Sequence, residues 1–392
     1  MATTAQKMRA YAGPKLLERG FRPFFLGAGI FAAIAMPLWV AMLAFDVSLT
    51  SSLAGRNWHL HEMLFGYLAA VIAGFLLTAI PNWTGRLPVV GRSLGALWGL
   101  WLAGRIAMMF LQGAPLVAAI IDSGFLVVFA GLLWREILAG KNIKNVPVCL
   151  IVSLLAVGNI AFHALWLTDN STVFAERLGL GMIAILISLI GGRITPSFTR
   201  NWMMKQNITP LPAGFDSVDK AGLATGVAAI VFWIAFAGHM LGGVLFGIAA
   251  LLYFYRVSRW RGLACLAEPL VVILHIGYLW LPLWFSLMAF SSFFPEVLSQ
   301  ASALHALSAG AIGTMTVAVV TRASLGHSGQ PLTADKWTMA IYGLIITGAL
   351  LRISTDWLPI DYTVAVSTAG ALWSMGFGLF VIIYGPMLLG RK

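Results

Sequence analysis

The chain has 392 residues, of which 60% are hydrophobic and only 10% are charged. A soluble domain carries about 25% charged residues, so this composition excludes an ordinary soluble protein and is typical of a membrane protein with many spans. The formal net charge is +11, but the cations fall at the ends of apolar segments, and the sequence shows no basic patch with interleaved aromatic residues. This placement is typical of cytoplasmic loops and argues against nucleic-acid binding.

A membrane-spanning helix needs about 20 mainly apolar residues, and about twelve segments of the sequence satisfy this criterion. In chain order they cover residues 24–45, 58–80, 94–111, 115–138, 148–167, 174–194, 223–238, 241–255, 266–290, 302–320, 339–351 and 363–389. We therefore predict an all-α, polytopic membrane helix bundle, with residues 1–392 in a single transmembrane domain. The seventh and eighth segments are short and nearly adjacent, and their merger into one helix would change the orientation of the C-terminal part.

Two polar stretches accompany the spans. Residues 1–20 are basic and lack the short apolar core and cleavage site of a signal peptide, so the first span is expected to remain in place. Residues 195–220 contain Pro196, Pro210 and Pro212 and are expected to form a cytoplasmic connector. The two cysteines, Cys149 and Cys265, lie far apart, which argues against a disulfide framework or a thiolate metal site.

The distribution of cations predicts which side each loop faces. Of the 25 Lys and Arg residues, 21 fall at the termini and in the even-numbered loops. Three, Arg56, Arg177 and Arg352, fall in the odd-numbered loops, and Arg105 lies inside a span. The positive-inside rule therefore predicts a multi-pass membrane protein with both termini in the cytoplasm.

Histidines gather toward the predicted outer side, at segment ends or about one turn from them. Five of the seven lie there, and they are His59, His61, His163, His239 and His305; another, His275, falls near the middle of the ninth segment. Neutral imidazole is the commonest metal ligand, so these six histidines are candidate metal ligands. An all-imidazole set suits copper, haem iron or zinc. The alternative is that they are interfacial residues that face water and lipid headgroups.

The first two histidines cannot easily face the same ligand plane, because residues two apart differ by about 200° around a helix. His59 and His61 therefore serve two sites, or one of them binds a metal and the other supports it. Glu62, which follows directly, is a candidate proton donor beside a metal site, although the sequence shows no cation near it. An ionisable residue at such a depth marks a functional site by default.

A second pair of ionisable residues lies inside the spans. Arg105 and Asp122 stand at similar distances before and after the turn near Gln112, so a helical hairpin would place them at one depth. The pair has two interpretations. It is either a structural ion pair between two buried charges, or Arg105 holds a cofactor carboxylate while Asp122 handles protons.

A weak internal repeat also appears. The second, sixth and tenth segments end in similar residues, and Gly66 and Gly310 each follow a histidine, His61 and His305, by five residues. This four-segment interval favours an arrangement in three arcs of four helices.

Six sequence blocks resemble the NnrS family: GFRPFF (20–25), WHLHEMLFG (58–66), PNWTGR (81–86), PSFTRNW (196–202), HAL (305–307) and TRASLGH (321–327). The resemblance implies a bacterial inner-membrane protein with haem and copper that takes part in nitric oxide metabolism and in protection from nitrosative stress. A looser likeness to haem-copper oxidases and nitric oxide reductases implies twelve helices in three arcs, with ligands on the second and tenth spans. The sixth span here has no histidine, so a copper site would need His163, His239 or His275.

These observations lead to one main functional hypothesis and two alternatives. We expect a haem- and copper-containing protein that binds nitric oxide and reduces it to N2O near the periplasmic side, with electrons from a quinol or an external donor. Haem or metal binding is expected at His59, His61, His275 and His305, with Arg105 as a cofactor contact and Glu62 as a catalytic proton donor. The alternatives are a non-enzymatic haem protein that senses or sequesters nitric oxide, and a proton-coupled transporter.

Overall fold

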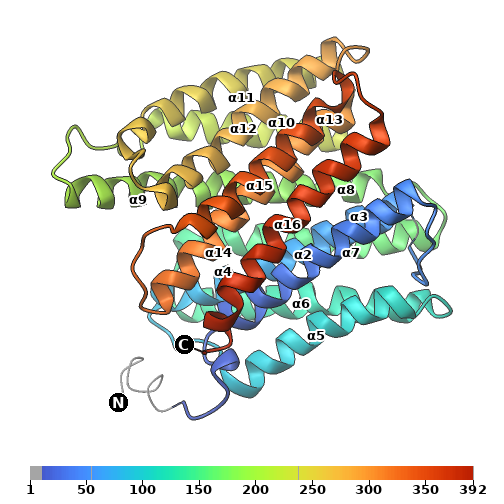
Figure 1. The fold of residues 1–392 in the computed structure, drawn as a ribbon, viewed down its shortest axis with the longest axis horizontal. Helices are drawn as coiled ribbons and strands as arrows, with labels where there is room; N and C mark the ends of the chain where they lie inside the picture. Colours follow the sequence, from blue (N-terminus) through green and yellow to red (C-terminus); the bar gives the residue numbers. More distant parts are fainter. Residues whose placement is uncertain (1–10, 54, 237, 392) are drawn as a thin grey trace. The chain divides into compact units, whose positions relative to one another are not determined.

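The computed structural model describes residues 11–53, 55–236 and 238–391 (Figure 1). The protein is 80% helical, with no β-strand in the described residues. The described residues contain 12 helices that are long and apolar enough to cross a membrane. The prediction of an all-α polytopic bundle is therefore confirmed, and the protein is a multi-pass membrane protein.

The spans follow one another along the chain, and three of them contain a short π-helical segment. In order, they are α2 (Phe21–Ala44), α3–η2–α4 (Gly55–His61, Glu62–Leu68, Ala69–Thr84), α5 (Gly91–Phe110), α6 (Pro115–Ala139), α7 (Val146–Leu167), α8–η4–α9 (Val173–Leu186, Ile187–Gly191, Gly192–Lys205), α10 (Ser217–Ala235), α11 (Met240–Ser258), α12 (Pro269–Phe293), α13–η6–α14 (Gln300–His305, Ala306–Ile312, Gly313–His327), α15 (Lys336–Ile353) and α16 (Tyr362–Leu388).

Local sequence signals fix several helix ends. Pro115 occupies the first position of α6, where its missing N–H costs no hydrogen bond. Gly85 ends α4 in the left-handed conformation, with φ of 68°. The side chains of Asp216 and Asp219 form a capping box at the start of α10. Helices α10 and α11 are separate, so the seventh and eighth spans do not merge.

The stretch expected to be a connector differs from the prediction. Helix α9 continues the sixth span to Lys205, so the first part of residues 195–220 is helical. Pro196 lies inside this helix, where a proline usually costs about 3 kcal/mol. Contacts of α9 with α12 and with the short helix η5 (Gly262–Cys265) bury Thr195, Thr199 and Met203. Packing of this kind outweighs local propensity.

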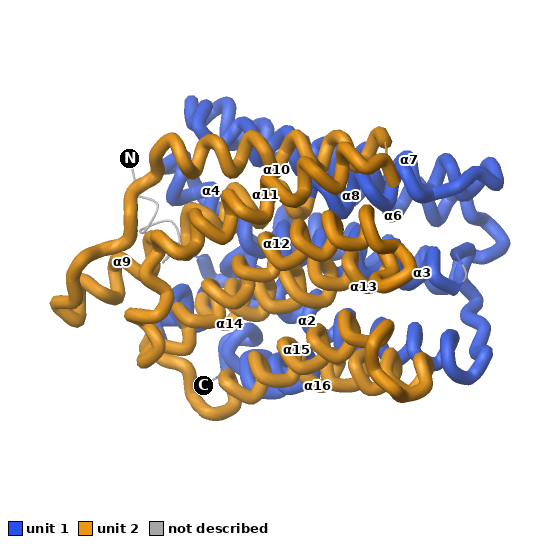
Figure 2. The backbone as a smooth tube through the Cα atoms, turned by 90° about the horizontal axis from the view of Figure 1, so that it is seen from above, with its two compact units in different colours: residues 1–182, 323–330, 377–392 blue, residues 183–322, 331–376 orange. Residues whose placement is uncertain are grey.

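The chain divides into two compact units, which Figure 2 shows in different colours. Unit 1 comprises residues 1–182, 323–330 and 377–392, and unit 2 comprises residues 183–322 and 331–376. Within unit 1, α5 packs against α6, α6 against α7, and α2 against α4. Within unit 2, α10 and α12 both pack against α11. The polar cluster described next lies wholly in unit 1.

Candidate functional site

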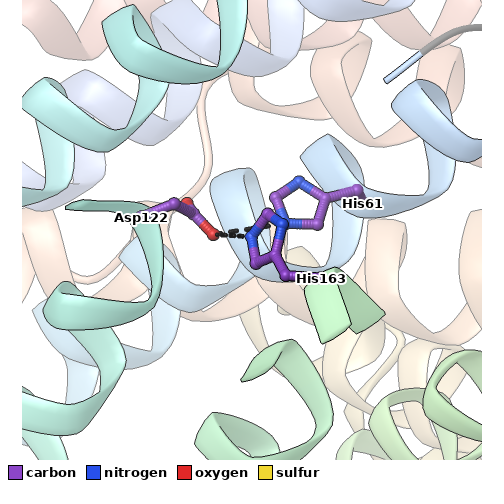
Figure 3. Close-up of side chains that lie close together, drawn as sticks. All are labelled: His61, Asp122 and His163. Atoms are coloured by element: carbon purple, nitrogen blue, oxygen red, sulfur yellow. Dashed lines mark hydrogen bonds and ion pairs between the residues drawn. The ribbon is translucent and has the colours of Figure 1, made fainter. Parts of the chain in front are cut away.

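Two imidazoles and one carboxylate meet in the interior of unit 1. His61 ends α3, Asp122 lies in α6, and His163 lies in α7 (Figure 3). Each side chain offers one ligand atom, and these atoms all lie within 4.8 Å of one another. The exposed fractions are 0% for His61, 1% for Asp122 and 5% for His163. Three ligand-type side chains from three helices therefore converge in a region closed to solvent.

Both ring nitrogens of His61 face oxygen atoms. Nδ1 lies 2.9 Å from Oε1 of Glu62. Nε2 lies 3.0 Å from Oδ1 of Asn159 and 3.2 Å from Oδ2 of Asp122. The same oxygen of Asp122 accepts a hydrogen bond from Nδ2 of Asn159 at 2.9 Å and lies 2.9 Å from Nε2 of His163. Oδ2 of Asp122 is thus the point at which the polar groups meet.

Arg105 holds the two carboxylates of this cluster. Its guanidinium donates to Oε2 of Glu62 at 2.6 Å and forms an ion pair with Oδ1 of Asp122. The side chain is buried, and it lies against Gly66, where an added Cβ would stand 2.6 Å from the guanidinium. The predicted pairing of Arg105 with Asp122 is confirmed. Glu62 also has a cation partner, which the sequence alone did not indicate.

A break in the regular helix positions His61 and Glu62. The π-helical segment Glu62–Leu68 begins directly after His61 and ends in the α-helix that starts at Ala69. Such segments are rare and occur frequently at functional sites. The same arrangement recurs in unit 2, where the π-helical segment Ala306–Ile312 begins directly after His305. In the sequence, Gly66 and Gly310 each follow a histidine by five residues. In the structure, each of these glycines lies in the π-helical segment that begins directly after that histidine.

The other four candidate histidines lie outside the cluster. His59 stacks on Trp39 of α2, with ring centroids 4.7 Å apart. His305 in unit 2 has Nδ1 2.6 Å from the carbonyl oxygen of Ala301. His239 is exposed and caps α11, because its Nδ1 accepts a hydrogen bond from the N–H of Leu241 at 3.2 Å. His275 is buried in the second turn of α12, not near its middle, and contacts Thr199.

Sequence reasoning missed one member of the cluster. Asn159 contacts both His61 and Asp122 and is only 1% exposed. Its position in an otherwise apolar span was the available signal, since a buried amide needs partners for both its oxygen and its nitrogen. The sequence placed Asp122 as a partner of Arg105 alone, whereas the structure also places it against two histidines.

The comparison with protein families finds one match that covers nearly the whole chain. The family model named NnrS, described as NnrS protein, matches residues 15–392. A search of the curated proteins gave no match. The sequence blocks that resembled this family lie within the matched region, and they include the helix that carries His61 and Glu62. On this basis, the chain belongs to the NnrS family.

Proposed function

We propose that this protein is a haem-containing enzyme of nitric oxide metabolism in the bacterial inner membrane, which binds nitric oxide and reduces it to N2O. The observation that carries the proposal is the NnrS match over residues 15–392. The buried cluster around His61 supports it, because ionisable groups in membrane spans are costly and mark functional sites. Twelve apolar spans also give an apolar gas access through the lipid.

The haem ligand in this proposal is His305, and the hydrogen bond of its ring in unit 2 supports this choice. A backbone carbonyl can only accept, so Nδ1 of His305 donates its proton to Ala301 and the lone pair lies on Nε2. A hydrogen bond of this kind fixes both tautomer and ring orientation in metal-binding histidines. When bound, haem would supply an iron atom that takes a diatomic ligand and exchanges single electrons. His59 and His275 remain secondary haem candidates.

The resemblance also implies copper, and the cluster of unit 1 fits a transition metal in general. Two imidazoles and one carboxylate are donors that bind several first-row metals. The two cysteines do not belong to the group, although soft sulfur ligands are the ones that select Cu(I). Copper therefore stays the prediction of the resemblance, while the cluster itself does not select it.

The residues of the chain have distinct tasks in this proposal. Reduction of two molecules of nitric oxide to N2O and water takes up two electrons and two protons. Glu62 lies 2.9 Å from Nδ1 of His61, so it holds the imidazole in place and can accept a proton from it. Arg105 fixes the carboxylate of Glu62 at 2.6 Å and offsets its charge. Electrons would come from a quinol or an external donor.

The test is turnover by the purified protein in detergent or vesicles. With a chemical reductant and nitric oxide, we expect steady N2O production in wild type, a strong decrease in Glu62→Gln, and loss of the haem Soret band in His305→Ala. A Soret band that shifts with nitric oxide but no steady N2O would overturn the enzyme and identify a sensor or sequestering protein. A preparation with neither haem nor bound metal would favour the transporter.

A further inference from the structure

We propose that His61, His163 and Asp122 form a mononuclear site for non-haem iron(II), with Nε2 of each histidine and Oδ2 of the aspartate as ligands. This inference deepens the proposed function and rests on it for the identity of the exogenous ligand, nitric oxide. The site itself rests on geometry, charge and donor chemistry in unit 1. It differs from the copper that the family resemblance implies.

The first argument is the spacing of the ligand atoms. Oδ2 of Asp122 lies 3.2 Å from Nε2 of His61 and 2.9 Å from Nε2 of His163. Three ligands on one face of an octahedron, each about 2.1 Å from the metal, lie about 3 Å from their neighbours. The two measured separations agree with this value. Small shifts of the rings therefore suffice to admit an ion, and three protein ligands leave the remaining positions of a six-coordinate ion for water or a diatomic ligand.

The second argument concerns the proton on His61. The carboxylate of Glu62 faces Nδ1 at 2.9 Å, and an ionised carboxylate can only accept, so the proton of the imidazole lies on Nδ1. The lone pair on Nε2 would then face Oδ1 of Asn159 and Oδ2 of Asp122. Three electron-rich atoms that face one another in a buried site are unfavourable. A cation between them removes the conflict.

The third argument is the charge of the cluster. Arg105 supplies one positive charge, while Glu62 and Asp122 supply two negative charges, so the three ionised side chains leave one negative charge uncompensated. All three are at most 6% exposed. Buried charges without compensation cost several kcal/mol. A divalent ion at the three ligand atoms offsets this excess and gives the three side chains and the metal a net charge of +1.

The donor set, taken together with the redox reaction proposed above, favours iron(II). Two histidines and one carboxylate on one face, with open positions opposite, are the arrangement typical of non-haem iron(II). Zinc also binds two histidines and a carboxylate in catalytic sites, but it has no redox chemistry to offer the proposed reaction, and Cu(I) prefers sulfur. The surrounding groups also resemble the support of an established metal site, because Glu62 accepts from His61 and Asn159 donates to Asp122. Arg105 holds the second oxygen of Asp122, which leaves Oδ2 for the metal.

The experiment measures the metal in the full-length protein as purified, because nearly any nitrogen and oxygen site binds added copper more tightly than iron. Iron and copper are counted by mass spectrometry, and haem iron is subtracted by a pyridine haemochrome assay. We expect one non-haem iron per chain. After reduction and addition of nitric oxide, the protein should give the quartet-spin EPR signal of a high-spin ferrous adduct, which haem iron does not give.

Substitutions of the proposed ligands test which side chains hold the iron that gives the EPR signal. Asp122→Asn keeps the shape of the side chain, and His163→Gln replaces the ring with a polar side chain that lacks the imidazole nitrogens. Both variants should lose the non-haem iron and its EPR signal while haem content stays at the wild-type level, which reports an intact fold. Asn159→Leu, which changes a supporting residue, should weaken iron binding about 10–100-fold. His327→Gln, a histidine of α14 outside the cluster, is the matched control and should keep the full signal.

Three outcomes would overturn the inference. Copper in place of iron, lost in Asp122→Asn, would reject the metal identity. Non-haem iron that persists in both Asp122→Asn and His163→Gln would reject these ligands. No bound metal in haem-replete wild type would reject the site itself. Iron with the expected EPR signal but no N2O production would support the site and reject the proposed reaction, so the two failures are distinguishable.

Discussion

At the scale of single residues, the cluster of unit 1 combines contacts that the sequence indicates with contacts that it cannot indicate. Arg105 and Asp122 belong to two successive helices of one hairpin, so a similar depth followed from counting residues, and the ion pair is present. Glu62 and Arg105 are 43 residues apart and Asn159 lies 98 residues from His61. Contacts over such separations depend on tertiary packing and cannot be read from the local pattern.

Loss of the cation in the cluster should destabilise the protein strongly. Arg105→Gln leaves the carboxylates of Glu62 and Asp122 buried without their partner, and breaking a buried ion pair costs about 3–5 kcal/mol. We expect a large decrease in the thermal unfolding midpoint of the detergent-solubilised protein at neutral pH.

The matched control is Arg86→Gln, which also breaks an ion pair with a buried carboxylate. The side chain of Arg86 is 42% exposed, and Glu136 keeps a second cation partner in Arg135. Exposed pairs contribute about 0–1 kcal/mol, so its effect should be small. Equal decreases in the two variants would contradict the assignment of Arg105 as the main counterion of the cluster.

At the scale of secondary-structure elements, the sequence indicated the spans but not the π-helical segments. Hydropathy reports the length of an apolar run, whereas a π-helical segment is a change in hydrogen-bond register that leaves the hydropathy unchanged. The second, sixth and tenth spans all contain such a segment, at Glu62–Leu68, Ile187–Gly191 and Ala306–Ile312. These are the spans whose ends looked alike in the sequence, so the structure agrees with the four-span interval of the predicted repeat.

Deletion of one residue from a π-helical segment should abolish cofactor binding at the nearby proposed site and leave the other proposed site intact. A π-helical segment accommodates one extra residue in a wider turn, so a deletion that restores the α-helix changes the directions of the side chains in and next to the segment, including that of the histidine before it. Deletion of Leu64 should abolish metal binding at the His61 cluster and keep haem. Deletion of Ser308 should abolish haem binding at His305 and keep the cluster metal.

The measurement is the ratio of haem to non-haem metal in each purified variant. Deletion of Leu189 in the sixth span is the control. No histidine precedes the π-helical segment of that span, so this variant should keep both cofactors. Simultaneous loss of haem and metal in every deletion variant, with normal amounts of folded protein, would mean that the segments do not position the histidines separately.

At the scale of the whole molecule, composition was sufficient for the fold class. About twelve spans were expected, and the described residues contain 12, because apolar length is a direct requirement of the bilayer. The division into two units was not predictable, since segments far apart in sequence belong to one unit, such as residues 1–182 and 377–392. The orientation in the membrane follows from the cation distribution and stays a prediction.

Labelling of introduced cysteines tests this orientation. Cys149 and Cys265 are buried, so they should react slowly with a maleimide that does not cross membranes. Glu296 and Lys144 are exposed and lie on opposite predicted sides. We expect Glu296→Cys to react in intact spheroplasts and Lys144→Cys to react only after lysis. The reverse pattern would place both termini outside the cytoplasm.

The three π-helical segments have a consequence for the origin of the chain. A π-helical turn arises when one residue is inserted into an α-helix. The segments of the second and tenth spans lie at matching points, after α-helical starts of seven and six residues, whereas that of the sixth span follows a start of 14 residues. One insertion before a duplication accounts for the matching pair more simply than two separate insertions do. The residue before the segment is His61 in the second span, Leu186 in the sixth and His305 in the tenth. The two segments that match in position therefore also share the histidine that precedes them.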